Sequence, residues 1–319
     1  MSSQVSDPSV AVIVVTFNGA PWIEQCLASL AGQSRLHSVI VVDNASTDDT
    51  LGIIHRRFPQ VRTVAQTINL GFGAGNNIGI RAAQVSGARH LYLLNQDAWA
   101  PAGSVAALAD FLDAHAEYGV ASPLHCSPDE SAVDRKTLAN YLSLHARPYL
   151  ADALVGEVRS HYRIRGVNAA AWMVRSETFD RVGGFDPLFF MYGEDDDWLD
   201  RLAHHSIGFA LVPAIRVVHL RQSPAPPLPP DARAQREHAV RWAYSRLLLQ
   251  TKRPGHTRAR VLMTLCLLGL LDPLVDFAFD RDRRELAHRW RACARLLRQH
   301  GKVARHARTT AQTGRHFLT

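Results

Sequence analysis

Four consecutive carboxylates, Glu194 to Asp197, directly follow the apolar and aromatic run Phe189–Tyr192 and Gly193. Like charges this close repel one another, and apolar neighbours raise the cost by drawing them out of water. A metal ion, a cationic partner or a proton taken from a substrate would offset that cost. The simpler alternative is that the acids cap a helix beginning near Trp198, where the helix dipole favours negative charge.

Further polar residues stand where predicted strands end. The strands are 10–16, 38–43, 90–95 and a late strand 215–220, and the polar residues at their ends are Thr16, Asn18, Asp43, Asn95, Asp97 and His219. In a doubly wound sheet, ligands bind beyond the carboxyl ends of the strands. The four ends together therefore predict one cleft.

The elements that position these residues alternate between strand and helix. Continuous β-branched runs such as Val10–Thr16 are typical of strands buried on both faces, and Pro21 opens a helix with one apolar stripe. Further strands are expected over 61–65, 169–174 and 207–211, with helices over 51–58, 78–85, 176–182 and 197–205. Residues 126–165 are less regular and are expected to form an insertion or a loop region on the acceptor side. The pattern predicts an α/β layered fold with a mainly parallel central sheet flanked by helices.

A glycine-rich stretch, Asn69–Asn77, contains Gly71, Gly73 and Gly75. Its GxGxG spacing differs from the GxGxxG dinucleotide fingerprint, and it follows the third strand instead of the first. A dinucleotide-dependent dehydrogenase is therefore disfavoured. The glycines still allow the backbone to approach a nucleotide diphosphate at a helix start, and a tight turn is the alternative.

Composition separates two parts of the chain. Of its 319 residues, those from Asp231 onward carry 19 Lys and Arg against 7 Asp and Glu, whereas the first 230 carry 17 against 22. An acidic body with a basic tail is not typical of a nucleic-acid-binding core. The division expected is a catalytic domain over 1–222, a Pro-rich linker over 223–231 and a basic helical extension over 232–319.

Two further patterns indicate the cellular compartment of the protein. The four cysteines are scattered without CxxC spacing, which favours a reducing compartment. No secretory signal is recognisable at the N-terminus, and the apolar run Val261–Leu271 is about half as long as a bilayer span requires. We expect a cytoplasmic protein, with the basic extension binding anionic lipid on the inner face of the plasma membrane, forming an oligomer contact, or remaining solvated. Basic residues expected on the polar faces of that extension are Arg233, Arg236, Arg241, Lys252, Arg253, Arg258 and Arg260.

Five motifs in this order resemble family 2 glycosyltransferases with the GT-A fold, and especially rhamnosyltransferase-like bacterial members. They are Val12–Asn18, Val41–Asp48, Asn69–Asn76, Leu94–Asp97 and Gly193–Asp195. The resemblance covers about residues 9–222. It implies an inverting, metal-dependent transfer of a sugar from a UDP- or dTDP-linked donor to a glycan or lipid-linked acceptor, in cell-surface polysaccharide synthesis.

The resemblance also implies site residues. Asp195 matches the general base, and Asp97 matches the last carboxylate of the Asp-x-Asp metal motif, whose first position is Asn95 here. His219 matches a further ligand for Mn²⁺ or Mg²⁺. The residues expected to contact the nucleotide or sugar substrates are Thr16, Asn18, Asp43, Asn69, Gly71, Gly73, Asn95, Asp197 and Trp172.

Two alternatives remain at this point. A sugar-nucleotide nucleotidyltransferase has a related fold, but it needs a basic residue in the loop after the first strand, and Thr16–Ala20 has none. A non-catalytic nucleotide-binding module is favoured if Asn95 and Gln96 abolish metal binding.

Overall fold

The computed structural model describes residues 10–220 continuously. Beyond them it describes residues 244, 245, 248, 249, 252, 302, 305, 306, 309, 310, 314, 317 and 318. The predicted linker and most of the predicted helical extension, including the apolar run 261–271, lie outside the described residues. The expected division into domains therefore stays a prediction.

The N-terminal half alternates strands and helices as expected. Its elements are β1 (Val10–Thr16), α1 (Ile23–Ala28), β2 (Leu36–Asp43), α2 (Thr50–Arg57), β3 (Arg62–Ala65), α3 (Phe72–Val85) and β4 (His90–Asn95). All seven residues of β1 are buried, because the strand is covered on both faces. It pairs in parallel with both β2 and β4, and β2 pairs in parallel with β3.

The second half completes one mixed sheet. Its elements are β5 (Ala98–Trp99), α4 (Ser104–Ala114), β6 (Tyr118–Cys126), β7 (Tyr162–Ile164), β8 (Ala171–Arg175), α8 (Ser176–Val182), α9 (Glu194–His204) and β9 (Gly208–His219). The strand order is β3-β2-β1-β4-β8-β6-β9-β5, with β7 paired to β9. Strand β8 is antiparallel to β4 and β6, and β5 and β7 are antiparallel to β9, whereas the other strands share one direction. The predicted mainly parallel α/β sheet is confirmed.

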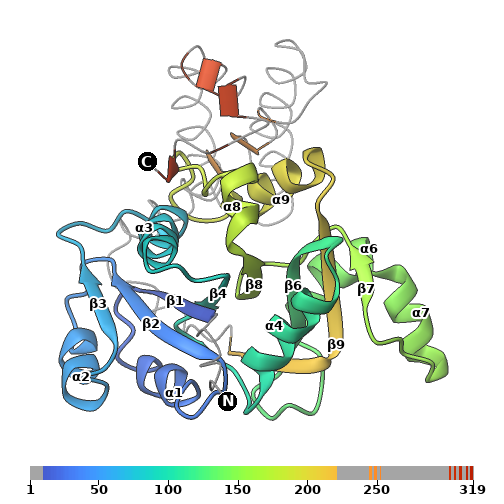
Figure 1. The fold of residues 1–319 in the computed structure, drawn as a ribbon, viewed down its shortest axis with the longest axis horizontal. Coiled ribbons are helices and arrows are strands. Elements are labelled where there is room, and N and C mark those ends of the chain that lie inside the picture. Colours follow the sequence, from blue (N-terminus) through green and yellow to red (C-terminus); the bar gives the residue numbers. More distant parts are fainter. Residues whose placement is uncertain are drawn as a thin grey trace, which may run out of the picture.

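Two features of this half differ from the prediction. The strands expected over 207–211 and 215–220 are one continuous strand, β9. Its pairing with β6 skips from Val212 to Arg216, so that Pro213, which has no N–H to donate, lies in a bulge and the ladder continues beyond it. Residues 135–155 are a chain of short helices: α5 (Arg135–Thr137), a π-helical turn η1 (Leu138–Leu142), α6 (Ser143–His145) and α7 (Arg147–Val155). Figure 1 shows α6 and α7 beside β7, on the outer side of β9.

Side chains of the central strands alternate between two apolar cores, one on each face of the sheet. Ala11, Ile13 and Val15 of β1 join a core with α3, α8 and α9, whereas Val12 and Val14 join a core with α1, α2 and α4. Figure 1 shows α3, α8 and α9 together above the sheet. The carboxyl ends of β1, β2 and β4 are thereby fixed next to the N-termini of α3 and α9. No helix within residues 10–220 or the other described positions is long and apolar enough to cross a bilayer.

Candidate active site

The end of β1 is joined to the end of β4 through side chains. Thr16 is fully buried, and its Oγ1 donates a hydrogen bond to Oε1 of Gln96 at 2.6 Å. The same oxygen accepts the backbone N–H of Phe17 at 3.1 Å. Gln96 therefore fixes the first loop of the pocket against the segment that carries Asn95 and Asp97.

The loops after β1 and β2 are joined in the same way. Asn18 has a left-handed backbone, with φ of +48°, and its Oδ1 accepts the Thr47 N–H at 2.8 Å. Asp43 is 1% exposed, and one of its carboxylate oxygens accepts the Ser46 N–H at 3.0 Å. Its other oxygen, Oδ1, is buried without a hydrogen-bond partner among the described residues. An unpaired buried carboxylate oxygen is costly, and a nucleotide base N–H would satisfy it.

The glycine-rich stretch forms a tight turn into α3. Asn69 Oδ1 accepts the N–H of Gly71 at 2.9 Å, and Gly71 has φ of +89°, a conformation that favours glycine. A Cβ at Gly71 would lie 2.0 Å from the carbonyl oxygen of Phe190, and at Gly73 it would lie 2.9 Å from Cβ of Phe185. The turn predicted as an alternative is present, and its closest neighbour is the segment that leads to the four acids.

Asp97 and His219 form the candidate cation site. Strand β5 pairs with the end of β9, which brings Oδ1 of Asp97 to 3.5 Å from Nε2 of His219. Asn95 Nδ2 lies 3.4 Å from the same ring nitrogen. Oδ1 of Asn95 and Nδ1 of His219 are buried without hydrogen-bond partners in the described structure. No cluster of three His, Cys, Asp or Glu residues able to hold a metal occurs among the residues described.

This donor set fits a cation that also binds the substrate. Mg²⁺ and Mn²⁺ are commonly held by one or two protein carboxylates together with substrate phosphates and water. Asp97 provides the carboxylate, His219 an imidazole and Asn95 a neutral oxygen, so the residues present fit such an ion when a diphosphate supplies the remaining ligands.

The four acids occupy the first turn of α9, which begins at Glu194 after Gly193, whose φ is +91°. The helix therefore starts earlier than the expected 197–205, and the helix dipole offsets part of the repulsion. Glu194 is 5% exposed, and burial followed by repulsion from Asp195 raises its pKa well above the usual range. Asp195 is partly exposed, and desolvation followed by repulsion from Asp196 raises its pKa to about 6.

Asp195 and Asn95 are connected through one short backbone segment. Oδ2 of Asp195 accepts the Ala169 N–H at 3.4 Å, and the next carbonyl, that of Ala170, accepts the Asn95 N–H at 2.9 Å. Asp195, the predicted base, and Asn95, next to the predicted cation site, therefore both contact the segment Ala169–Ala170, although they are a hundred positions apart in the chain.

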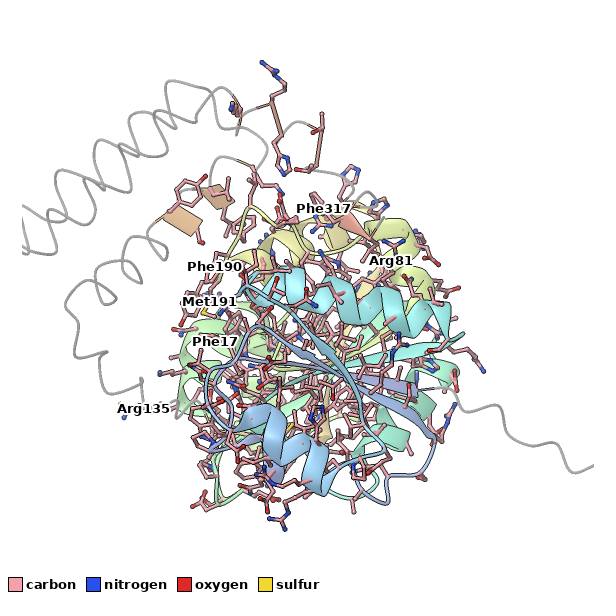
Figure 2. The ribbon with its side chains drawn as sticks, turned by 90° about the vertical axis from the view of Figure 1, so that its left-hand side faces the viewer. Phe17, Arg81, Arg135, Phe190, Met191 and Phe317 are labelled. Carbon is pink, nitrogen blue, oxygen red and sulfur yellow. The ribbon has the colours of Figure 1, made fainter. Side chains whose placement is uncertain are left out.

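The glycine-rich turn reaches the same region from the other side. The Phe72 N–H donates to the carbonyl of Phe190 at 3.1 Å. Figure 2 shows Phe190 and Met191 next to the start of α3, on the same side of the molecule as Phe17. The loops after β1 and β3 and the segment before α9 thus open on one side.

Two of the predicted substrate contacts lie elsewhere. Trp172 is fully buried in the core, with its ring centroid 5.6 Å from the rings of both Trp198 and Phe209, so it packs the sheet against α9 and cannot stack on a sugar. Asp197 is 3% exposed, and its carboxylate bonds Arg201 at 3.1 Å and Lys252 at 2.7 Å. It is an internal ion-pair partner and does not reach an acceptor.

Three residues that shape the site were not predicted. Gln96 was noted only as a departure from the acidic motif. Asn44 is 2% exposed and donates from Nδ2 to the carbonyl of Gly71 at 3.0 Å. Asn77 exchanges two hydrogen bonds of 2.8 Å with the backbone of Phe185, which ties α3 to the segment before α9. Asn and Gln side chains that follow strand ends or lie in the glycine-rich helix were the feature of the sequence that could have identified these three residues.

The fold is of the GT-A type found in glycosyltransferases. Among solved structures, the mannosyltransferase PcManGT from Pyrobaculum calidifontis, in complex with GDP-Man and Mn²⁺, aligns with a TM-score of 0.53 at 22% identity and covers 98% of this chain and 86% of its own. GalNAc-T7 with UDP, GalNAc and Mn²⁺ aligns with a TM-score of 0.52 at 14% identity, covering 77% of this chain and 50% of its own. At these identities the likeness concerns the fold.

Sequence comparison gives the family. The profile of "Glycosyl transferase family 2" matches residues 11–168, and that of "N-terminal domain of galactosyltransferase" matches residues 153–223. An N-acetylglucosaminyl-diphospho-decaprenol L-rhamnosyltransferase of Mycobacterium tuberculosis is 31% identical over 230 residues, which are 65% of this chain and 75% of that protein. The chain belongs to glycosyltransferase family 2 and is a glycosyltransferase.

Proposed function

We propose that this enzyme transfers a deoxyhexose such as rhamnose from a UDP- or dTDP-linked donor to a lipid-linked or glycan acceptor in cell-surface polysaccharide synthesis. The mycobacterial relative bears the name of a rhamnosyltransferase acting on a sugar attached to decaprenol diphosphate. That likeness supports the lipid-linked acceptor over a free glycan.

The observation that carries the proposal is the Asp195 carboxylate. It is partly exposed at the N-terminus of α9, and desolvation followed by repulsion from Asp196 raises its pKa to about 6. A sugar hydroxyl is a poor nucleophile near neutral pH, so a carboxylate must take its proton as the new bond forms. The acceptor oxygen then bonds the anomeric carbon, the bond from that carbon to the diphosphate oxygen breaks, and the diphosphate leaves with the electron pair. Attack from the face opposite the diphosphate inverts the anomeric centre.

The donor is held in this proposal by the loops at the strand ends. Asp43 Oδ1 accepts an N–H of the base, and Thr16 and Asn18 line the nucleoside. Backbone from Asn69 to Gly73 lies along the ribose and diphosphate, at the N-terminus of α3, where the helix dipole favours phosphate. The unpaired Oδ1 of Asp43 supports this placement.

A divalent cation, Mn²⁺ or Mg²⁺, would be held by Asp97, His219 and Oδ1 of Asn95. When bound, it would neutralise negative charge that develops on the leaving diphosphate. The pairing of β5 with β9 holds the carboxylate of Asp97 beside the ring of His219, where both would bind the cation. The imidazole favours Mn²⁺ slightly.

A thermal-shift and product screen tests the proposal. The full chain is incubated with Mn²⁺ and a panel of UDP- and dTDP-linked sugars that includes dTDP-rhamnose, with short-chain polyprenyl diphospho-N-acetylglucosamine as acceptor. We expect stabilisation by one nucleotide series and formation of an extended lipid-linked disaccharide. Binding of nucleotide without transfer to any acceptor, in wild type and Asp195→Asn alike, would favour the non-catalytic nucleotide-binding module.

We also propose that the protein works at the cytoplasmic face of the plasma membrane, held there by its basic C-terminal region. A lipid-linked acceptor makes membrane residence useful, and each basic residue near an anionic surface contributes about 1 kcal/mol. Lys252 was predicted to contact lipid, but it is buried and paired with Asp186 inside the protein, so it does not belong to the lipid-binding set. Deleting residues 253–300 should abolish co-sedimentation with phosphatidylglycerol vesicles, and persistent binding would dismiss this role.

A further inference from the structure

A cluster of buried charges joins the C-terminal part of the chain to the segment that leads to Asp195. Nζ of Lys252 lies 2.5 Å from Oδ2 of Asp186 and 2.7 Å from Oδ1 of Asp197. The other oxygen of Asp197 accepts two hydrogen bonds of 3.1 Å from Arg201. The exposed fraction of each of these four side chains is at most 4%. Nε2 of His306 also lies 2.8 Å from Oδ2 of Asp186.

The charges in this cluster balance when His306 is neutral: two carboxylates face one ammonium and one guanidinium. Lys252 and His306 hold the pKa of Asp186 down to about 2, against the raising effect of burial. A buried ion pair of this kind is costly to assemble, and breaking it by removing one partner is strongly destabilising, so it holds the groups that it joins in one arrangement. Lys252 bridges Asp186 and Asp197, so the part of the chain that is held is the segment between these two carboxylates.

Asp186 and Asp197 bracket the segment before the catalytic carboxylate. Asp186 begins it by accepting the Leu188 N–H at 2.9 Å, and Asp197 ends it two residues beyond Asp195. Within it, Tyr192 and Gly193 both have left-handed backbones, with φ of +68° and +91°. Such residues persist only where their surroundings fix them.

The same C-terminal part supplies a second tie to this segment. Oγ of Ser245 donates a hydrogen bond of 3.0 Å to the carbonyl of Met191. Ser245, Leu248 and Lys252 are all buried. Ser245 therefore contacts the segment 186–197 at Met191, and Lys252 contacts both of its ends.

We infer that Lys252 is a positioning residue, which fixes the Asp195 carboxylate against the acceptor hydroxyl by bridging Asp186 and Asp197. The inference rests on the proposed function, since it assigns a role to Asp195 as base. It makes the C-terminal extension part of the acceptor side of the active site. The donor side is held separately, by the loops after β1, β2 and β3.

The test compares four variants of the full chain. Lys252→Met removes the bridge, and Lys252→Arg keeps the charge and can still span both carboxylates. Lys302→Met, at an exposed lysine of the same extension, is the matched control. Because Lys252→Met leaves an unpaired buried charge and could fail to fold, the double variant Lys252→Met/Asp186→Asn restores the charge balance without the bridge.

Hydrogen exchange gives a readout that does not depend on the reaction. We expect faster amide exchange in residues 186–197 of the double variant, with unchanged exchange in β1 and β4. We also expect kcat for transfer from dTDP-rhamnose to fall by on the order of tenfold to a hundredfold, with unchanged KM for the donor and unchanged binding of dTDP with Mn²⁺. Lys252→Arg should recover most of kcat.

Wild-type exchange and wild-type kcat in the folded double variant would overturn the inference. A uniform rise in exchange across the protein, or a loss of dTDP binding, would also overturn it, because it would make Lys252 a general stabilising residue. Failure of the proposed function would give a different result: Asp195→Asn would transfer sugar at the wild-type rate, independently of the effect of Lys252→Met.

Discussion

Substituting Asp195 by Asn should stabilise the protein while removing its activity. The pKa of Asp195 is raised from 3.8 to about 6, first by desolvation and then by repulsion from Asp196. A folded-state pKa above the unfolded-state value means that ionising this carboxyl costs stability. That cost is present above pH 6 and is relieved as the pH falls to about 4.

The size of the effect follows from the shift. A displacement of about two pKa units corresponds to at most about 3 kcal/mol, and solvent screening of this partly exposed group reduces it to roughly 1–2 kcal/mol. Asp195→Asn carries no charge at any pH. Its free energy of unfolding at pH 7.5 should therefore exceed that of the wild type by roughly 1–2 kcal/mol, and the difference should vanish near pH 4.

Urea denaturation of both proteins at pH 7.5, 6 and 4.5 measures this difference. Asp129→Asn is a control of opposite sign: Asp129 accepts hydrogen bonds from Ser127 and Ser131, which lower its pKa to about 2, so its loss should destabilise the protein near neutral pH. Transfer by Asp195→Asn should fall by about 10²–10⁴-fold with dTDP binding intact. An Asp195→Asn variant that is less stable than wild type at pH 7.5 would refute the reasoning, since the carboxylate would then be held by favourable contacts.

Three further substitutions probe the core, the glycine-rich turn and the cation site. Trp172→Ala should lower the free energy of unfolding by about 3–5 kcal/mol in urea titrations, because the ring fills the core, whereas a sugar-stacking role would change donor KM with little loss of stability. Gly71→Ala should abolish nucleotide binding in calorimetry, because the added Cβ would collide with the carbonyl oxygen of Phe190. Gly87→Ala is the matched control: Gly87 has a φ of +79° with open space around it, so this variant should bind nucleotide normally. Asp97→Ala should weaken dTDP binding in Mn²⁺ and leave metal-free binding unchanged, and equal titrations of the variant and the wild type in Mn²⁺ would dismiss the cation assignment.

The sheet could be predicted where its strands are continuous apolar runs. β1 and β4 have that pattern, and both are found where expected. β6 was missed because Gly119, Pro123 and His125 interrupt its apolar residues. Pro123 is tolerated because it stands at the register shift between β6 and β9. β6 lies between β8 and β9 in the sheet, an arrangement that local sequence does not reveal.

The site was predicted more successfully in its order along the chain than in its side-chain contacts. Asp97 and His219 lie 3.5 Å apart, and Asp195 is linked to Asn95 through Ala169 and Ala170, whereas the roles assigned to these residues stay predictions. Asp197 was wrongly given a substrate role because its partner, Lys252, is 55 positions further along the chain. A long-range ion pair of this kind leaves no mark on sequence periodicity.

Charge repulsion in the first turn of α9 connects these observations. Burial, followed by repulsion from Asp195, raises the pKa of Glu194 well above its usual range, and the charge of Asp197 is paired with Arg201 and Lys252. Desolvation, followed by repulsion from Asp196, raises the pKa of Asp195 to about 6, which suits it to accept a proton in the transition state. The same repulsion would drive the turn apart if Asp197 were not held. A base of useful strength and a buried lysine from a distant part of the chain are therefore two consequences of placing four acids in a row.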